Sequence, residues 1–106
     1  MKLDLPFWTL DHLSDTQVLS GLDTLVRAHR NTTAEIVAHL GEVEERRLHL
    51  KAATPSLFAY CTERLGLSED EASRRIDVAR LARRFPKIFE MLACGELSLT
   101  VAASWS

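Results

Sequence analysis

Apolar residues recur at intervals of three and four along most of the first half of the chain, with polar residues between them. The members of this pattern are Val18, Leu19, Leu22, Leu25, Val26, Ile36, Val37, Leu40 and Val43. Such spacing places them together on one side of an α-helix. Ser14 and Gln17 have the spacing of a capping box. We therefore expect a helix that begins near Asp15 and runs to about Leu48.

A polar segment, Asn31-Thr32-Thr33, interrupts the pattern, and Thr32 with Glu35 offers a second possible helix start. The apolar phase is the same on both sides, so one long helix, straight or bent, is favoured. At 1.5 Å per residue it would be about 50 Å long, more than so small a domain can cover. A second copy of the chain is the natural cover. The residues expected at that dimer interface are Leu22, Val26, His29, Ile36 and Leu40.

Shorter helices are expected in the second half. Thr54 before Pro55 is a helix start signal, because proline at the first helical position loses no hydrogen bond. That helix should cover residues 55–65. Ser68, followed by three acidic residues, should begin the next helix, which should stop before Pro86.

Two further helices complete the pattern. Residues 87–94 should form a short amphipathic helix that ends at Gly95, and Ser98 should start the last one. The fold class is therefore all-α: a long amphipathic helix packed against a compact bundle of four shorter ones. Residues 1–13 are expected to be an extended lead-in, with Pro6, Phe7 and Trp8 available to pack on a single helical domain formed by residues 14–106.

The segment at about residues 55–85 resembles a helix-turn-helix, since Gly66 stands where a turn needs a positive φ and Ala72 is small where two helices would cross. The formal net charge is −2, so a DNA-binding surface would have to be local. Between residues 72 and 87 there are six basic residues and one acid, Asp77. The candidate contacts to double-stranded DNA are Ser68, Ser73, Arg74, Arg75, Asp77, Arg80, Arg83, Arg84 and Lys87.

Within this set, Ser68, Ser73, Arg74 and Asp77 lie early in the helix, where side chains reach base edges, and the remaining basic residues suit phosphates. Carboxylates at positions 69–71 oppose that reading, because they would lie near the DNA. The basic residues are equally explained as a solvated helix face. The first hypothesis is a small, dimeric helix-turn-helix DNA-binding protein without catalytic activity of its own. The alternative function is a protein–protein interaction or dimerisation module in which the long helix is the functional surface.

The runs SLFAYCTERLGLSEDEASRRI, ARLARRFP and AEIVAHLGEVEERRLHL resemble the helical N-terminal region of a bacterial HNH endonuclease family common in myxobacteria. The run from LGLSEDEASRRI to ACGELSLTVA also resembles the helix-turn-helix of ParB partition proteins. These resemblances imply an all-helical, DNA-associated module. Members of the HNH family continue into a nuclease domain, and these 106 residues do not contain one. A stand-alone domain, a shortened relative and a fragment all remain open.

Catalytic chemistry is not indicated. The four histidines lack the HExxH spacing of a zinc helix, and there is no CxxC, no GxxxxGK[ST] and no GxGxxG motif. We therefore expect no enzyme, no cofactor and no metal. Cys61 and Cys94 are expected to be buried small hydrophobic residues in a reducing compartment. No stretch is apolar enough for a membrane span or a signal peptide, so a cytoplasmic protein is expected.

Overall fold

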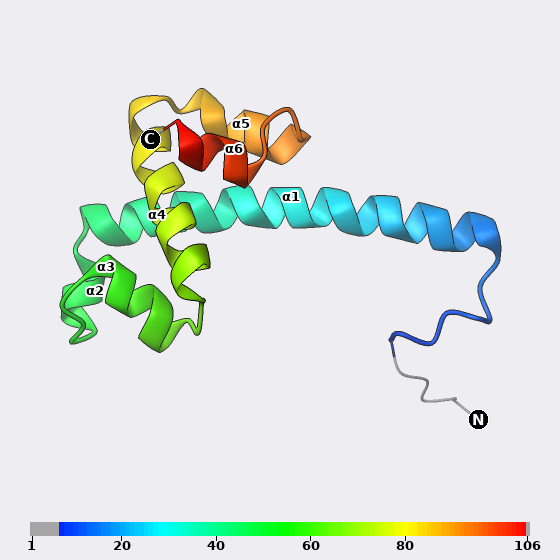
Figure 1. The fold of residues 1–106 in the computed structure, drawn as a ribbon, viewed down its shortest axis with the longest axis horizontal. Coiled ribbons are helices and arrows are strands. Elements are labelled where there is room, and N and C mark those ends of the chain that lie inside the picture. Colours follow the sequence, from blue (N-terminus) through cyan, green and yellow to red (C-terminus); the bar gives the residue numbers. More distant parts are fainter. Residues whose placement is uncertain (1–6, 106) are drawn as a thin grey trace.

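The computed structural model describes residues 7–105, and this range is built from helices without any strand. The all-α prediction is confirmed. The longest helix is α1 (Asp15–Glu45), drawn horizontally in Figure 1. The shorter elements are α2 (Leu48–Lys51), α3 (Leu57–Ala59), the π-helical turn η1 (Tyr60–Arg64), α4 (Glu69–Arg84), α5 (Lys87–Cys94) and α6 (Leu99–Ser104).

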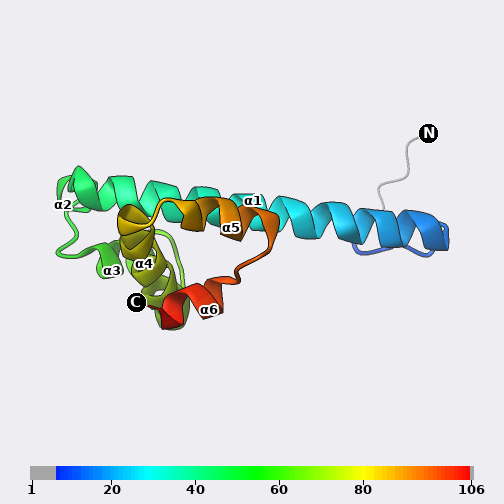
Figure 2. The ribbon, with the colours of Figure 1, turned by 90° about the horizontal axis from the view of Figure 1, so that it is seen from above.

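The shorter helices all gather on the C-terminal half of α1. In Figure 1, α5 and α6 lie on one side of that half and α2 and α3 on the other, while α4 crosses it. Figure 2 shows the N-terminal half of α1 bare from a second direction. The radius of gyration is 17.2 Å, against about 13 Å for a compact chain of this length. The molecule is therefore a small bundle with one protruding helix.

Helix α1 is continuous through residues 31–33, as the apolar phase predicted. Its capping box is confirmed: Gln17 N donates to Ser14 Oγ (3.2 Å), and Ser14 N donates to Gln17 Oε1 (2.9 Å). The helix ends at Glu45, three residues before the expected end at Leu48. The reason is Arg47, whose φ of 54° is left-handed and breaks the helical path.

The helix expected over residues 55–65 forms, but Thr54 and Pro55 do not start it. Thr54 is buried, and its hydroxyl donates to the carbonyl oxygen of His49 (2.6 Å), which closes the preceding loop. Ser56 is the N-cap instead, and its Oγ accepts from Ala59 N (3.0 Å). After one turn the helix widens into the π-helical η1, where Leu65 N donates to Tyr60 O (3.2 Å).

Helix α4 is the centre of the bundle. It follows a turn in which Gly66 has a φ of 71°, and its own capping box joins Ser68 to Glu71. It stops at Arg84, before Pro86, as expected. The core that surrounds it contains Ala34, Val37, Leu40, Leu57, Cys61, Ala72, Ile76, Val78, Ala79, Leu81, Ala82, Ile88, Leu92, Leu97 and Ala102. Three of the six buried residues of α4 are alanines, so its neighbours can approach closely.

The α5–α6 connection rests on α1 through a glycine. Gly95 has a φ of 86° and ends α5, as predicted. A Cβ at this position would lie 2.7 Å from Cζ of Arg30, so the glycine also makes room for the Arg30 guanidinium. Ser98 caps α6 as expected. The tail of the bundle is thereby fixed against the middle of α1.

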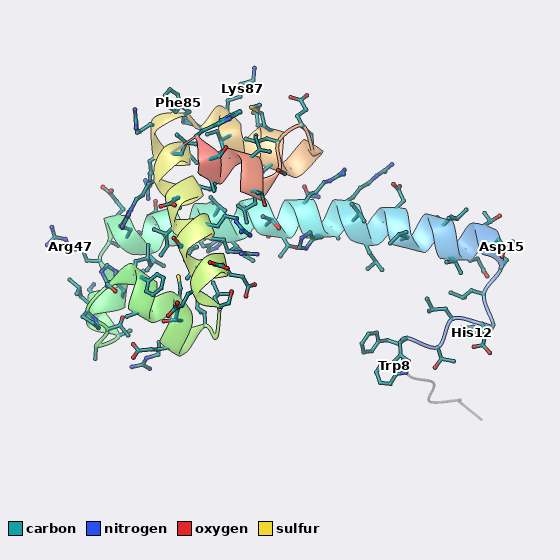
Figure 3. All side chains as sticks on the ribbon, in the orientation of Figure 1. Trp8, His12, Asp15, Arg47, Phe85 and Lys87 are labelled. Carbon is teal, nitrogen blue, oxygen red and sulfur yellow. The ribbon has the colours of Figure 1, made fainter. Side chains whose placement is uncertain are left out.

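The lead-in does not pack on the domain, contrary to expectation. Phe7 is 88 % exposed and Trp8 is 69 % exposed. Residues 7–13 form turns rather than an extended strand, one of them closed by Leu13 N donating to Leu10 O (2.9 Å). Pro6 lies outside the described residues. In Figure 3, Trp8 lies on the lead-in, below the protruding half of α1.

Candidate interaction surface on the long helix

The protruding half of α1 displays its apolar residues to water. Every residue from position 15 to position 32 is exposed, including Leu19 (68 %), Leu22 (59 %) and Leu25 (68 %). We call the residues Val18, Leu19, Leu22, Leu25 and Val26 the α1 stripe. Scattered surface leucines are ordinary, but a contiguous row of large aliphatic side chains marks an interaction surface.

The α1 stripe leads into a groove farther along the same helix. Eighteen residues make about five full turns of an α-helix, so Ile36, Leu40 and Val43 lie on the same side as Val18, Leu22 and Leu25. The groove has a volume of about 370 Å³. Its lining residues are Thr32, Glu35, Ile36, His39, Leu40, Val43, Tyr60 and Leu65. We call it the α1–η1 groove. Stripe and groove form one apolar track along the molecule.

The residues expected at a dimer interface divide into two groups. Leu22, Val26 and His29 are exposed on the protruding half, and Ile36 is 38 % exposed beside the groove. Leu40 was wrongly assigned to that interface. It is 3 % exposed and belongs to the core of its own chain, because the short helices cover the C-terminal half of α1.

Two of the predicted DNA contacts are occupied by ion pairs with α1. Arg80 binds Glu44 through two nitrogens, at 3.1 Å from Nε to Oε1 and 2.7 Å from Nη2 to Oε2. Arg83 Nη2 lies 3.1 Å from Glu42 Oε1, and Glu42 also accepts from Arg46 Nε (2.7 Å). These pairs hold α4 to α1. The basic face expected from the sequence is therefore partly neutralised within the chain.

The other predicted DNA contacts do not form one face. Ser68 uses its hydroxyl in the helix cap, and Arg75 Nη1 donates to the carbonyl oxygen of Glu71 (3.3 Å). Arg84 lies on the opposite side of α4 from Arg75, since nine residues correspond to about 900° of rotation. On α4, Ser73 is exposed, whereas Arg74 and Asp77 are half-buried. Lys87, labelled in Figure 3, is exposed at the start of α5.

Sequence reasoning missed a cationic cavity at the middle of α1. It has a volume of about 250 Å³ and contains His29 and Arg30 of α1 and Arg75 of α4. Its other lining residues are Thr33, Leu92, Gly95, Leu97, Ser98 and Leu99, so no carboxylate lines it among the described residues. Neither arginine forms an ion pair in the described part of the chain. To predict this cavity from the sequence, one would have to know that Arg75, far along the chain, comes to lie beside His29 and Arg30.

The cysteines differ from one another. Cys61 is fully buried, and that burial raises the pKa of its thiol. Cys94 is exposed, so the expectation that both are buried is wrong for it. Both are free thiols. Within residues 7–105 no three His, Cys, Asp or Glu side chains come together as metal ligands would.

The ion pairs make stability depend on pH. The hydrogen bond from Arg80 lowers the pKa of Glu44, and those from Arg46 and Arg83 lower the pKa of Glu42, below the ordinary value of 4.5. A lowered folded-state pKa stabilises the fold above that value, and the gain disappears as pH falls through the folded-state pKa. We expect the urea midpoint to drop between about pH 5 and pH 3, and to drop less in Glu42→Gln/Glu44→Gln.

Glu45→Gln is the matched control for this measurement, because Glu45 follows Glu44 directly and makes no ion pair within the described range. Its pH profile should match that of the unmodified chain. Identical profiles for the double variant and the control would show that the α1–α4 ion pairs do not stabilise the fold. The side chains are partly exposed, so the difference should shrink in high salt.

Comparison of the chain with protein-family models, with curated proteins and with solved structures finds no match. Among the described helices none has the length and apolar character that crossing a membrane requires.

Proposed function

We propose that this chain is an association module that forms a homodimer through the α1 stripe. The observation that carries the proposal is the unbroken exposure of α1 from position 15 to position 32, with large aliphatic side chains in one row. Contacts within its own chain stabilise this part of the helix little. Burying the row of apolar side chains in an assembly would stabilise that assembly by about 25 cal/mol for each Å² of apolar surface removed from water.

Charge favours an antiparallel arrangement of the two α1 helices. If the two copies cross at Leu22, Leu19 faces Leu25 of the other copy, and Asp15 faces the other copy's His29. A parallel arrangement would set Asp15 against Asp15, and like charges in direct opposition repel. Antiparallel helix dipoles also attract. The row is therefore complementary to a second copy of itself, as a two-fold interface requires.

A different protein that carries a similar helix would also fit against the α1 stripe. The resemblance to the N-terminal region of HNH endonucleases makes a longer relative of that kind a partner of the required chemistry. In that case the module would pair with the nuclease and modulate it. The homodimer is the direct case, since both surfaces are on this chain.

The mass in solution tests the proposal. Sedimentation equilibrium over a range of micromolar concentrations should give a species of twice the chain mass of 11.9 kDa, in equilibrium with monomer. A single species of one chain mass at the highest concentrations would overturn the homodimer.

Binding of double-stranded DNA is the second candidate function, and the cationic cavity of His29, Arg30 and Arg75 favours it. Phosphate oxygens match guanidinium donors that lack a carboxylate partner. The corner between η1 and α4, with Gly66 at its turn and Ser68 at the helix start, supports a helix-turn-helix docking mode. The outward-facing acids of α4 oppose it, so we rank it second.

Fluorescence anisotropy with a random duplex at low salt tests this candidate. Arg30→Gln/Arg75→Gln should weaken binding and reduce the slope of log K against log salt by about one for each phosphate that is no longer neutralised. Glu42→Gln/Glu44→Gln should strengthen binding, because it frees Arg80 and Arg83. If the unmodified chain shows no binding at low salt, or if neither pair of substitutions changes it, the DNA-binding candidate fails.

A further inference from the structure

We propose that in the homodimer the lead-in of one copy places its Phe7–Trp8 pair in the α1–η1 groove of the other copy. This inference rests on the antiparallel dimer proposed above and adds a second contact to it. The exposed part of α1 that carries the stripe, from position 15 to position 32, is about 27 Å long and one helix, or about 10 Å, wide. That is a few hundred Å², against about 800 Å² that each partner buries in an interface of standard size. The stripe alone would therefore give a weak dimer, and a second contact would strengthen it.

The lead-in carries apolar surface that its own chain does not use. Phe7 and Trp8 stack edge to face, with ring centroids 4.9 Å apart and an angle of 81° between planes. Both rings are mostly exposed, and Leu10 is exposed as well. Aromatic side chains of this kind are the usual anchors of protein interfaces, because each buries a large area at small entropic cost.

Trp8 cannot reach the centre of the groove of its own chain. The α1 residues that line the groove run from Thr32 to Val43, so its centre lies near position 38, about 35 Å from Asp15 at 1.5 Å per residue. Trp8 precedes Asp15 by seven positions, which span at most about 25 Å when fully extended. A fully extended lead-in would therefore reach only the near edge of its own groove, at Thr32.

The partner's lead-in has the required reach. In an antiparallel pair that crosses at Leu22, position 14 of one copy lies opposite position 30 of the other. From there the groove centre near position 38 is about 12 Å away. In the single chain the lead-in turns back under α1 (Figure 3), and once the turn closed by Leu13 N opens, the six positions from Ser14 back to Trp8 can span up to about 20 Å toward the groove. In the crossed arrangement the partner's lead-in therefore reaches the centre of the groove.

The groove suits an aromatic occupant. Its walls come from Ile36, Leu40, Val43 and Leu65, with the ring of Tyr60 beside them. Its volume of about 370 Å³ lies within the range of pockets that bind small apolar groups, about 300–1,000 Å³. The Glu35 carboxylate, one of its lining residues, offers an acceptor for the indole N–H of Trp8, which has only a donor to satisfy.

Tryptophan fluorescence tests the inference. In a Trp105→Phe background Trp8 is the sole tryptophan. Its quenching by acrylamide should fall several-fold as concentration drives dimer formation, with a blue shift of the emission. Leu65→Gln, which alters the groove, should restore quenching while sedimentation still shows a dimer. Leu50→Gln is the matched control, since Leu50 has almost the same exposure as Leu65 but lies outside the groove.

Mixed dimers separate the two chains. One chain keeps Trp8 and carries Leu65→Gln, and the other has an intact groove with Trp8→Phe; both carry Trp105→Phe. After subunit exchange, Trp8 should be shielded in the mixture and exposed in the first chain alone. A dimer whose Trp8 stays fully quenchable, or whose shielding ignores Leu65→Gln, overturns this inference and leaves the proposed function standing. A monomer at all concentrations overturns both.

Discussion

Replacing Leu22 and Leu25 with glutamate is expected to convert the dimer into folded monomers. Each leucine contributes at least about 1.5 kcal/mol when it is removed from water. The dimer would lose four of them, about 6 kcal/mol, so the dissociation constant should rise more than about a thousandfold. The two carboxylates introduced at position 22 would also face each other across the interface, and those at position 25 would each face the other copy's Leu19. Sedimentation equilibrium should then show one chain mass, where the proposed dimer of the unmodified chain would show two.

The fold itself should not change in this variant. Both leucines are exposed in the single chain, and glutamate forms helices about as well as leucine. Circular dichroism should therefore show the helical content of the unmodified chain. Ser20→Glu/Thr24→Glu is the matched control, because these positions lie on the opposite side of α1 and receive the same added charge. Dissociation of the control as well would point to net charge rather than to the α1 stripe.

The outline of the fold followed from local signals in the sequence. The apolar phase predicted one continuous α1, and Ser14 predicted its start. Gly95 and Ser98 predicted the end of α5 and the start of α6. These signals act within one helical turn, so the residues that carry them lie close together in the chain. Such features can be recognised without knowledge of the tertiary structure.

Features that depend on distant partners could not be recognised in this way. Arg80 and Glu44 are 36 residues apart, and nothing near either one shows that they will meet. The sequence indicated Thr54 as a helix start. Its hydroxyl instead donates to the carbonyl oxygen of His49, and that bond depends on a loop that the apolar pattern did not reveal. The single-turn helix α2 was missed for the same reason. Left-handed Arg47 separates it from α1, and arginine carries no signal for that conformation.

The candidate site shows the same division. Periodicity placed Leu22 and Leu40 on one stripe, and the structure confirms that they lie on one side of α1. It could not tell that the shorter elements cover Leu40 and leave Leu22 exposed, because coverage depends on how far the bundle extends along the helix. One apolar row is therefore divided in two: its C-terminal part belongs to the core, and its N-terminal part is exposed to water.

Substitutions in the two parts of this row should separate stability from association. Leu40→Ala removes a side chain that is 3 % exposed and should lower the free energy of unfolding by about 3 kcal/mol. That is a large share of the roughly 5–15 kcal/mol available to a small domain. Ile36→Ala, at the open edge of the groove, should lower it by less than about 1 kcal/mol, because its side chain is already partly in water.

Urea unfolding at a concentration where the chain is monomeric measures both effects, and the Leu22→Glu/Leu25→Glu background keeps it monomeric. In a chain without the Leu22→Glu/Leu25→Glu substitutions, Ile36→Ala should still increase the quenching of Trp8, since Ile36 lines the groove in which we propose that Trp8 binds. If Ile36→Ala destabilised the monomer as much as Leu40→Ala, the chain itself would fill the groove in solution. In that case the groove would not be free to receive a partner.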